Sequence, residues 1–263
     1  MSNISVKEAS QISLDIGRIL LESGSTTNKV ELTMRKVCTS FGFEETESYV
    51  TPTGIFLSVY DHDGRLHTSI RRVENRRTDL GRVSRVSRLV HDLEAQHKAE
   101  EMPNMTAAEF RAELARIESE QPWPAWFVIL CGGLTSGSFC LLFGGSWPEF
   151  GVAYIVGVLV SLSLRLLGLL KLNNFLLHLL GAAGVVTFAK LIDIGVPQIR
   201  LDTIIIGGIM LLVPGLSFTN AIRDTMSGDL VSGTARAVEA LFIAIAIATG
   251  SGVMLKLWAL WGF

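Results

Sequence analysis

The sequence predicts a membrane protein: an all-α bundle of five transmembrane helices with an N-terminal cytoplasmic α+β domain. Charge is the first observation, because residues 1–124 hold 16 of the 23 Lys and Arg and 19 of the 25 Asp and Glu, whereas residues 125–263 hold 7 and 6. The second observation is that long apolar stretches occur only in residues 125–263. We therefore expect two domains, a charged domain 1–124 that faces water and a transmembrane domain 125–263.

The transmembrane domain contains five candidate spans. Crossing a hydrocarbon core of ~30 Å takes about 20 mostly apolar residues. Stretches that meet this requirement lie at roughly 125–145, 149–170, 175–195, 202–222 and 236–262. Tryptophans near their ends are typical membrane-interface anchors: Trp123, Trp126, Trp147, Trp258 and Trp261. The pairs Gly133/Gly137 and Gly181/Gly184 would allow helices to approach closely.

The distribution of basic residues predicts a cytoplasmic N-terminus. The Arg-rich domain ends at the first span, the loop GSWPEF after that span has no Lys or Arg, and the turn after the second span carries Lys171. Lys190 and Arg200 flank a loop that would then face outward, which weakens the signal. The first ten residues contain no apolar run, so we expect no cleavable signal peptide.

The water-facing domain is predicted to be α+β. Apolar residues recur at helical spacing up to Gly24 and again up to Gly42, and Ser25–Thr27 offers the N-cap of the second helix. Three β-rich segments follow, ETESYV, GIFLSVY and RLHTSI, with a hairpin turn at 61–64. Helical spacing returns at about 78–96, and Thr106-x-x-Glu109 has the form of a capping box that opens a last helix.

An arginine-rich segment lies near the middle of this domain. One interpretation is a basic funnel for an anionic solute or a contact with anionic lipid head groups. The other is an ordinary solvated helix face, because Glu74, Asp79 and Asp92 are interleaved with the arginines. The segment contains Arg71, Arg72, Arg76, Arg77, Arg82, Arg85 and Arg88.

Several functional classes find little support. A net charge of −2 argues against a general nucleic-acid binder, so we expect no nucleic acid partner. The three cysteines are widely spaced and form no CxxC pair, and a polar hairpin tip explains Asp61, His62, Asp63 and His67 better than a metal site. No nucleophile–base spacing or phosphate loop is present. We therefore expect neither an enzyme nor a bound metal or cofactor.

The fourth candidate span contains a break, in the stretch LLVPGLSFTNAIRD at 211–224. Proline removes a backbone donor, and an unpaired peptide group in hydrocarbon costs several kcal/mol. A kink satisfied by neighbouring helices is one interpretation. The other is a solute site, because half-helix N-termini attract carboxylates in transporters. On that interpretation the substrate-binding residues are Pro214, Gly215, Ser217, Thr219 and Asn220.

Ionisable groups at membrane depth are the candidates for gating or ion coupling. Arg236 and Glu239 are spaced i, i+3 and could neutralise each other, although near a span end they could also reach the interface. His178 has apolar neighbours and could relay protons or simply pack as a neutral side chain. The predicted gating or ion-coupling residues are Asp224, Asp229, Arg236, Glu239 and His178.

Three stretches resemble one known family. They are LLESGSTTNKVE near the start, TPTGI at 51–55, and LLVPGLSFTNAIRDTMSGDLVSGTARAVEAL at 211–241. Together they make nearly the whole chain similar to the threonine/serine exporter family. The residues that match the most specific of these stretches are Pro214, Gly215, Asn220, Asp224, Gly228, Asp229, Gly233 and Arg236.

The resemblance implies a secondary transporter of the bacterial inner membrane. Full-length members fuse two membrane halves, and this chain looks like the larger subunit of the split branch, which is associated with succinate export. A smaller multi-span membrane subunit would then be a partner, besides the lipid bilayer and a small carboxylate or amino-acid substrate. The alternatives are a threonine/serine exporter and a membrane-anchored sensor or scaffold. A homo-oligomer is also an option, because one five-span bundle is small for an alternating-access site.

Overall fold

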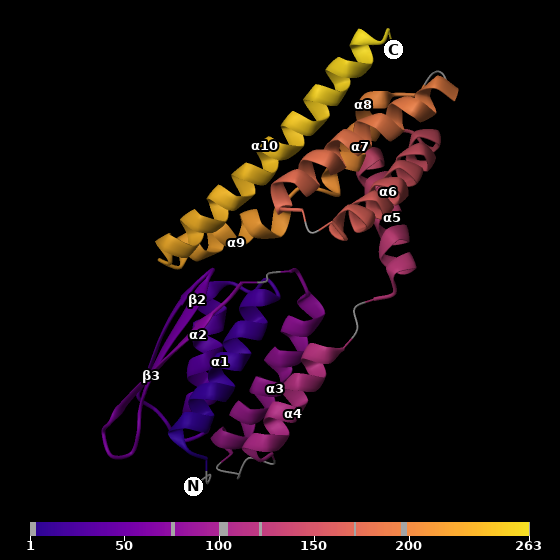
Figure 1. Cartoon of the computed structure of the whole chain (residues 1–263). Helices are drawn as coiled ribbons and strands as arrows, with labels where there is room; N and C mark the ends of the chain where they lie inside the picture. The colour runs from indigo at the N-terminus through magenta and orange to yellow at the C-terminus, as the bar shows by residue number, and fades with distance from the viewer. Residues whose placement is uncertain are drawn as a thin grey trace. The chain divides into compact units, whose positions relative to one another are not determined.

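The computed structural model describes residues 4–74, 77–99, 105–120, 123–170, 172–195 and 199–262 (Figure 1). Arg76 and Lys171, two of the basic residues considered above, lie outside these ranges. The chain forms two compact units. The first contains Met1–Gln121 and Leu216–Ala237, and the second contains Pro122–Gly215 and Val238–Phe263. A segment from the apolar half of the sequence therefore belongs to the charged N-terminal unit.

The first unit is the α+β part of the molecule. Its N-terminal portion contains α1 (Val6–Glu22), α2 (Thr27–Ser40), a small sheet, α3 (Leu80–Lys98) and α4 (Ala107–Ser119). From later in the chain it also includes α9 (Gly215–Met226), apart from its first residue, and the start of α10 (Leu230–Leu260). The predicted capping box is present, because the Thr106 hydroxyl accepts the amide of Glu109 while the Glu109 carboxylate accepts the amide of Thr106.

The sheet has three antiparallel strands in the order β1 (Thr46–Thr51), β2 (Gly54–Tyr60) and β3 (Leu66–Arg72). The predicted hairpin turn joins β2 to β3. Asp61 organises it, because its Oδ1 accepts the amides of Asp63 and Arg65 and its Oδ2 lies 2.9 Å from Nε2 of His67. Gly64 completes the turn with a φ of 76°. The structure thus gives Asp61 and His67 a role in the hairpin itself.

One face of the sheet and four helices enclose the core of the first unit. Alternation along the strands turns Val50, Ile55, Leu57 and Val59 inward, and all four are buried. Buried residues on the helices recur at helical spacing, as the sequence indicated. They include Ile12, Ile16 and Leu20 of α1, Val30, Met34 and Val37 of α2, Val86 and Val90 of α3, and Phe110, Leu114 and Ile117 of α4.

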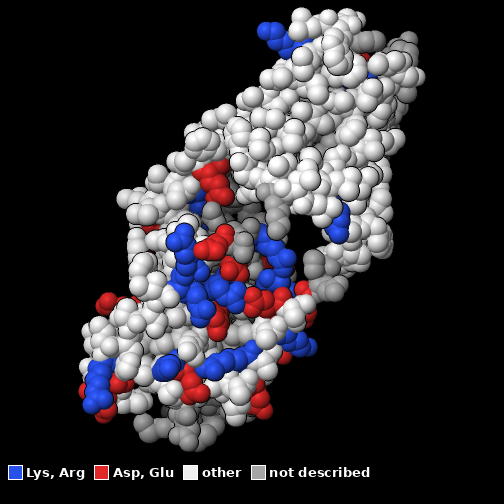
Figure 2. Space-filling view, in the orientation of Figure 1, with Lys and Arg blue, Asp and Glu red and all other residues white. Residues whose placement is uncertain are grey.

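Four arginines of the Arg-rich segment, Arg71, Arg72, Arg82 and Arg85, have acidic partners. Arg71 lies 3.1 Å from Asp15, and Arg85 lies 3.0 Å from Glu120. Arg82 is buried, and its Nη2 donates to the carbonyl of Glu118. On the face drawn in Figure 2, basic and acidic side chains of this unit are interleaved. These contacts favour the interpretation of an ordinary charged surface for the arginines involved.

The second unit is made of apolar helices: α5 (Ala125–Leu142), α6 (Trp147–Gly168), α7 (Asn174–Gly195), α8 (Leu201–Met210) and the remainder of α10. Among the residues that the structure describes, four helices are long and apolar enough to cross a membrane, and the number rises to five if the interrupted pair α8–α9 counts as one span. The predicted five spans correspond to the higher number. The last span is longer than predicted, because α10 begins at Leu230.

Close backbone contact between α5 and α6 depends on glycine. A Cβ atom at Gly133 would lie 2.8 Å from the carbonyl oxygen of Tyr154, and one at Gly137 would lie 2.8 Å from the ring of Phe150. The predicted close approach at this pair is therefore confirmed. The other pair is divided: a Cβ at Gly181 would lie 3.0 Å from the side chain of Leu164 on α6, whereas one at Gly184 would meet only Phe188 of its own helix, at 3.6 Å.

The tryptophans divide into two groups. Trp123, Trp126, Trp147 and Trp261 are exposed, as expected for interface anchors. Trp258 is buried in the core of the second unit and packs against Trp261 with 6.0 Å between ring centroids. Its large apolar surface is thus used for helix packing, which its position near the chain end did not indicate.

Candidate functional site

The predicted break in the fourth apolar stretch is present. Helix α8 ends at Met210 and α9 begins at Gly215. Pro214 has no N–H to donate to the carbonyl of Met210, so the helical hydrogen-bond pattern stops there. The amide of Gly215 bonds to the carbonyl of Val213 at 2.8 Å. The start of α9 is thus a helix N-terminus, where the first amides lack partners within their own helix.

The buried face of α9 is polar and contacts the loop between α1 and α2. Asn220 and Asp224, one helical turn apart, are both buried. The side-chain Nδ2 of Asn220 donates to the carbonyl oxygen of Gly24 at 2.9 Å. The backbone amide of Thr27 donates to Oδ1 of Asp224 at 3.2 Å. Two side chains of α9 therefore bond to backbone groups of a loop some 200 positions earlier in the sequence.

The N-cap of α2 lies within the predicted Ser25–Thr27, but its capping bond comes from elsewhere. Thr26 occupies the N-cap position, but its side chain makes no capping hydrogen bond. The carboxylate of Asp224 takes that place. The amides at a helix N-terminus lack internal partners and carry partial positive charge, so a carboxylate is a favourable cap even when it comes from a distant segment.

Arg236 on α10 completes the link. Its Nε lies 3.0 Å from Oδ2 of Asp224, and the side chains are only 7% and 0% exposed. Its Nη2 donates to the carbonyl oxygen of Ser25 at 2.8 Å. Removing one partner of a buried ion pair typically costs 3–5 kcal/mol, because the remaining charge is left uncompensated. The structure therefore couples Arg236 to Asp224 and to the α1–α2 loop.

A tight turn between α9 and α10 brings these residues together. Gly228 has a φ of 91°, and the amide of Asp229 bonds to the carbonyl of Asp224 at 2.9 Å. A Cβ atom at Gly233 would lie 2.9 Å from the amide nitrogen of Thr225, so only glycine fits between the two helices. Asp229 is then in position to accept a hydrogen bond from Oγ1 of Thr27, at 3.1 Å.

Glu31 adds a third carboxyl group. Its Oε1 accepts the backbone amide of Val50 at 2.8 Å. Burial raises the pKa of Glu31 above its usual range, and the negative charges of Asp229 and Asp224 add to this effect. Glu31 therefore holds a proton more readily than an exposed glutamate does.

These eight residues form what we call the polar latch: Gly24, Ser25, Thr27, Glu31, Asn220, Asp224, Asp229 and Arg236. Its two halves come from two of the stretches that carry the family resemblance, and the hydroxyl of Ser232 reaches the carbonyl of Val50, beside the third. Gly24, Ser25, Thr27 and Glu31 were not predicted as site residues. Their presence in the stretch LLESGSTTNKVE was the available signal. Chemically, the polar latch can hold or release a proton and can connect the loop to the helix turn.

The other predicted site residues have different surroundings. At the break, Pro214 and Ser217 are half-buried, whereas Gly215 and Thr219 are exposed. His178 belongs to the second unit, where its Nδ1 lies 2.7 Å from the carbonyl oxygen of Asn174 in its own helix. Glu239 also belongs to the second unit. In the described part of the chain, no three His, Cys, Asp or Glu side chains are grouped so that they could hold a metal ion.

Comparison with known proteins gives consistent matches. The family model of the threonine/serine exporters, ThrE, matches residues 11–258. A protein of Escherichia coli named "Probable succinate transporter subunit YjjP" is 24% identical over 98% of this chain and 97% of its own length. The "Threonine/serine exporter" of Corynebacterium glutamicum is 24% identical, and the match covers 92% of this chain but 50% of that protein. No solved structure matches.

Proposed function

The chain belongs to the threonine/serine exporter family, and we propose that it is one subunit of a secondary transporter that exports a small carboxylate metabolite, succinate or a related dicarboxylate. A smaller multi-span membrane protein would be its partner. Supporting this, the match to the E. coli subunit covers 97% of that protein, whereas matches to two exporters of this family cover 50% and 47%. The missing half would come from the partner.

The interrupted helix pair α8–α9, which leads into the polar latch, is the observation that carries the proposal. In transporters, broken helices supply partly positive N-termini that attract substrate carboxylates. We assign Pro214, Gly215, Ser217, Thr219 and Asn220 to substrate binding. Asn220 has a double role, because its amide donates to Gly24 in this structure and would have to leave that oxygen before it could contact a substrate.

Asp224, Asp229 and Arg236 act in gating or ion coupling in this proposal, with Glu239 and His178 as further candidates. Two of the hydrogen bonds across the polar latch end on a carboxylate, that of Asp224 or Asp229, and protonation of the carboxylate would weaken them. Release of the loop would therefore be sensitive to protons, as the coupling of export to a proton gradient requires. The proposed site of action is the bacterial inner membrane, with the N-terminus in the cytoplasm.

Counterflow in proteoliposomes tests the proposal directly. The chain is reconstituted with and without the smaller subunit, and uptake of labelled succinate and labelled threonine is measured against the unlabelled solutes. We expect succinate exchange that requires both subunits. If threonine exchanges and succinate does not, the substrate is an amino acid and the protein is an amino-acid exporter. The family match also favours this alternative. Exchange of neither solute would favour a sensor or scaffold.

Asn220→Leu tests the assigned site. We expect a loss of export at a normal level of membrane-inserted protein, because leucine removes the amide but keeps a similar volume. Met226→Leu is the matched control on the same helix, since Met226 is 83% exposed. Wild-type flux in Asn220→Leu would contradict the assignment of this residue.

A further inference from the structure

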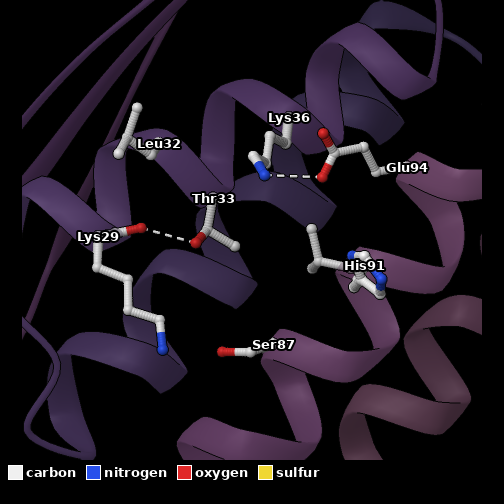
Figure 3. Close-up of a pocket in the computed structure, with 8 residues that line it drawn as sticks. Lys29, Leu32, Thr33, Lys36, Ser87, His91 and Glu94 are labelled. Carbon is white, nitrogen blue, oxygen red and sulfur yellow. Dashed lines mark hydrogen bonds and ion pairs between the residues drawn. The ribbon is translucent and has the colours of Figure 1, made fainter. Parts of the chain in front are cut away.

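A pocket of about 270 Å³ lies between α2 and α3 of the first unit, apart from the polar latch (Figure 3). Each helix contributes one stripe of residues spaced i, i+3, i+4 and i+7, which share a face of the helix. Packed helices normally present apolar side chains to each other. Here six of the eight lining residues have polar side chains, and their carbon stems contribute apolar surface: Lys29, Leu32, Thr33 and Lys36 from α2, and Ser87, Val90, His91 and Glu94 from α3.

The pocket carries excess positive charge. Lys36 lies 2.7 Å from one oxygen of Glu94, and Lys98 lies 2.8 Å from the other. Hydrogen bonds from these two lysines lower the pKa of Glu94 to about 2, so its carboxylate stays ionised. Each of its two oxygens is already paired with a lysine. Lys29 makes no ion pair with any residue that the structure describes. The lining can therefore neutralise the negative charge of a bound anion.

The positions of the polar groups indicate the shape of that anion. In Figure 3 the ammonium group of Lys29 and the hydroxyl of Ser87 point toward each other at one end of the pocket, and Lys36 lies at the other. The Ser87 hydroxyl has no hydrogen-bond partner among the described residues. The two lysines are seven positions apart, which is ~10 Å along a helix axis. Leu32 and Val90 lie among the lining residues and supply apolar surface.

We propose that this α2–α3 pocket binds an elongated dicarboxylate of metabolite size. One carboxylate would contact Lys29 and Ser87, the other would contact Lys36 and His91, and the carbon chain would lie against Leu32 and Val90. A compact anion such as phosphate cannot reach both ends. The choice of succinate as the probe rests on the proposed function, whereas the need for two separated negative charges rests on the pocket alone.

The histidine ring in the pocket gives a local measurement. The full-length chain is labelled with ¹³C-histidine in lipid nanodiscs, and the His91 signal is identified by its loss in His91→Gln. Succinate, phosphate and threonine are then titrated separately. We expect succinate to shift the His91 signal in the wild type and in Lys7→Gln, a control with an exposed lysine on α1. In Lys29→Gln we expect at least ~10-fold weaker binding, as for loss of a charge-assisted contact.

The inference fails if succinate leaves the His91 signal unchanged, if Lys29→Gln binds like the wild type, or if phosphate or threonine shifts the signal as strongly as succinate does. Ser87→Ala, which removes a hydroxyl without adding bulk, should also weaken binding. Because His91 reports only on the pocket, the result does not depend on whether counterflow detects transport. Failure of this inference and failure of the proposed function can thus be told apart.

Discussion

A glycine contact in the second unit and a charged contact in the first illustrate two kinds of close packing. In the second unit, α5 and α6 approach through Gly133 and Gly137, and the surrounding core is apolar. In the first unit, α9 and α10 meet the α1–α2 loop through buried charges and amides, with Asp224 and Arg236 at the centre. The first type of contact tolerates little added volume, whereas the second tolerates little change in charge.

Helix α10 contributes to both units. Its first turns, up to Ala237, belong to the first unit and carry Arg236, whereas the remainder belongs to the second unit and is apolar. The two kinds of contact can be tested separately.

The largest expected effect comes from the charge-dependent contact. Arg236→Met leaves Asp224 buried without its cation, which should cost ~3–5 kcal/mol of unfolding free energy. The double variant Asp224→Asn/Arg236→Met should recover much of this loss, because no uncompensated charge remains. Chemical denaturation in detergent, followed by tryptophan fluorescence, measures both variants. Equal loss in the single and double variants would mean that the charge pair is not the source of the effect.

A smaller effect is expected where volume matters. Gly133→Ala places a Cβ atom 2.8 Å from the Tyr154 carbonyl, and overpacking of this kind costs ~1–3 kcal/mol. Gly151→Ala on α6 is the matched control, because a Cβ atom there meets nothing within 4 Å. Thermal unfolding in detergent should separate the two variants. If both melt like the wild type, the α5–α6 contact does not depend on glycine.

A pH-dependent effect sharpens the comparison further. The pKa of Glu31 is raised by burial, so its ionised form is less favourable in the folded state than in the unfolded chain. Stability should therefore decline as pH rises from the ordinary glutamate pKa through the raised one. Glu31→Gln should remove this decline. Hydrogen exchange of the backbone amides in the α1–α2 loop measures it, because these amides lose protection as stability falls. A decline that persists unchanged in Glu31→Gln would have to come from other groups.

The smallest effect should come from Glu94 at the protein surface. Hydrogen bonds from Lys36 and Lys98 lower the pKa of Glu94 to about 2. Its contribution to stability is therefore complete above the ordinary glutamate pKa and is lost as pH falls from that pKa toward 2. Glu94→Gln should cost less than ~1 kcal/mol at neutral pH, as is usual for surface ion pairs. High salt should reduce the difference. A loss as large as that of Arg236→Met would contradict the distinction between surface and buried charge.

Much of the fold could be predicted from the sequence, because the signals are local. The capping box at Thr106 and Glu109, the turn at Asp61 and the break at Pro214 each depend on residues a few positions apart. The predicted number of spans agrees with the higher of the two numbers that the structure allows. The predicted domain boundary between residues 124 and 125 stays a prediction. The compact units are defined differently, because Leu216–Ala237 belongs to the same unit as Met1–Gln121.

The candidate site was only partly predictable. Asn220, Asp224, Asp229 and Arg236 were identified by their type and position, but as residues along a solute path or near a span end. Only the structure shows that they are hydrogen-bonded to Gly24, Ser25 and Thr27. Spacing along one helix could suggest Glu239 as a partner for Arg236, but it could not reveal Asp224 across the turn at Gly228.

The sequence by itself determined where helices, strands and turns form and which stretches are apolar enough to enter a membrane. These properties follow from periodicity, capping and backbone chemistry within a few residues. Only the tertiary structure decided that the α1–α2 loop is bonded to α9 and α10, and that Asp224 caps a helix from 197 positions away. Contacts of that kind depend on how the whole chain folds back, which no local pattern specifies.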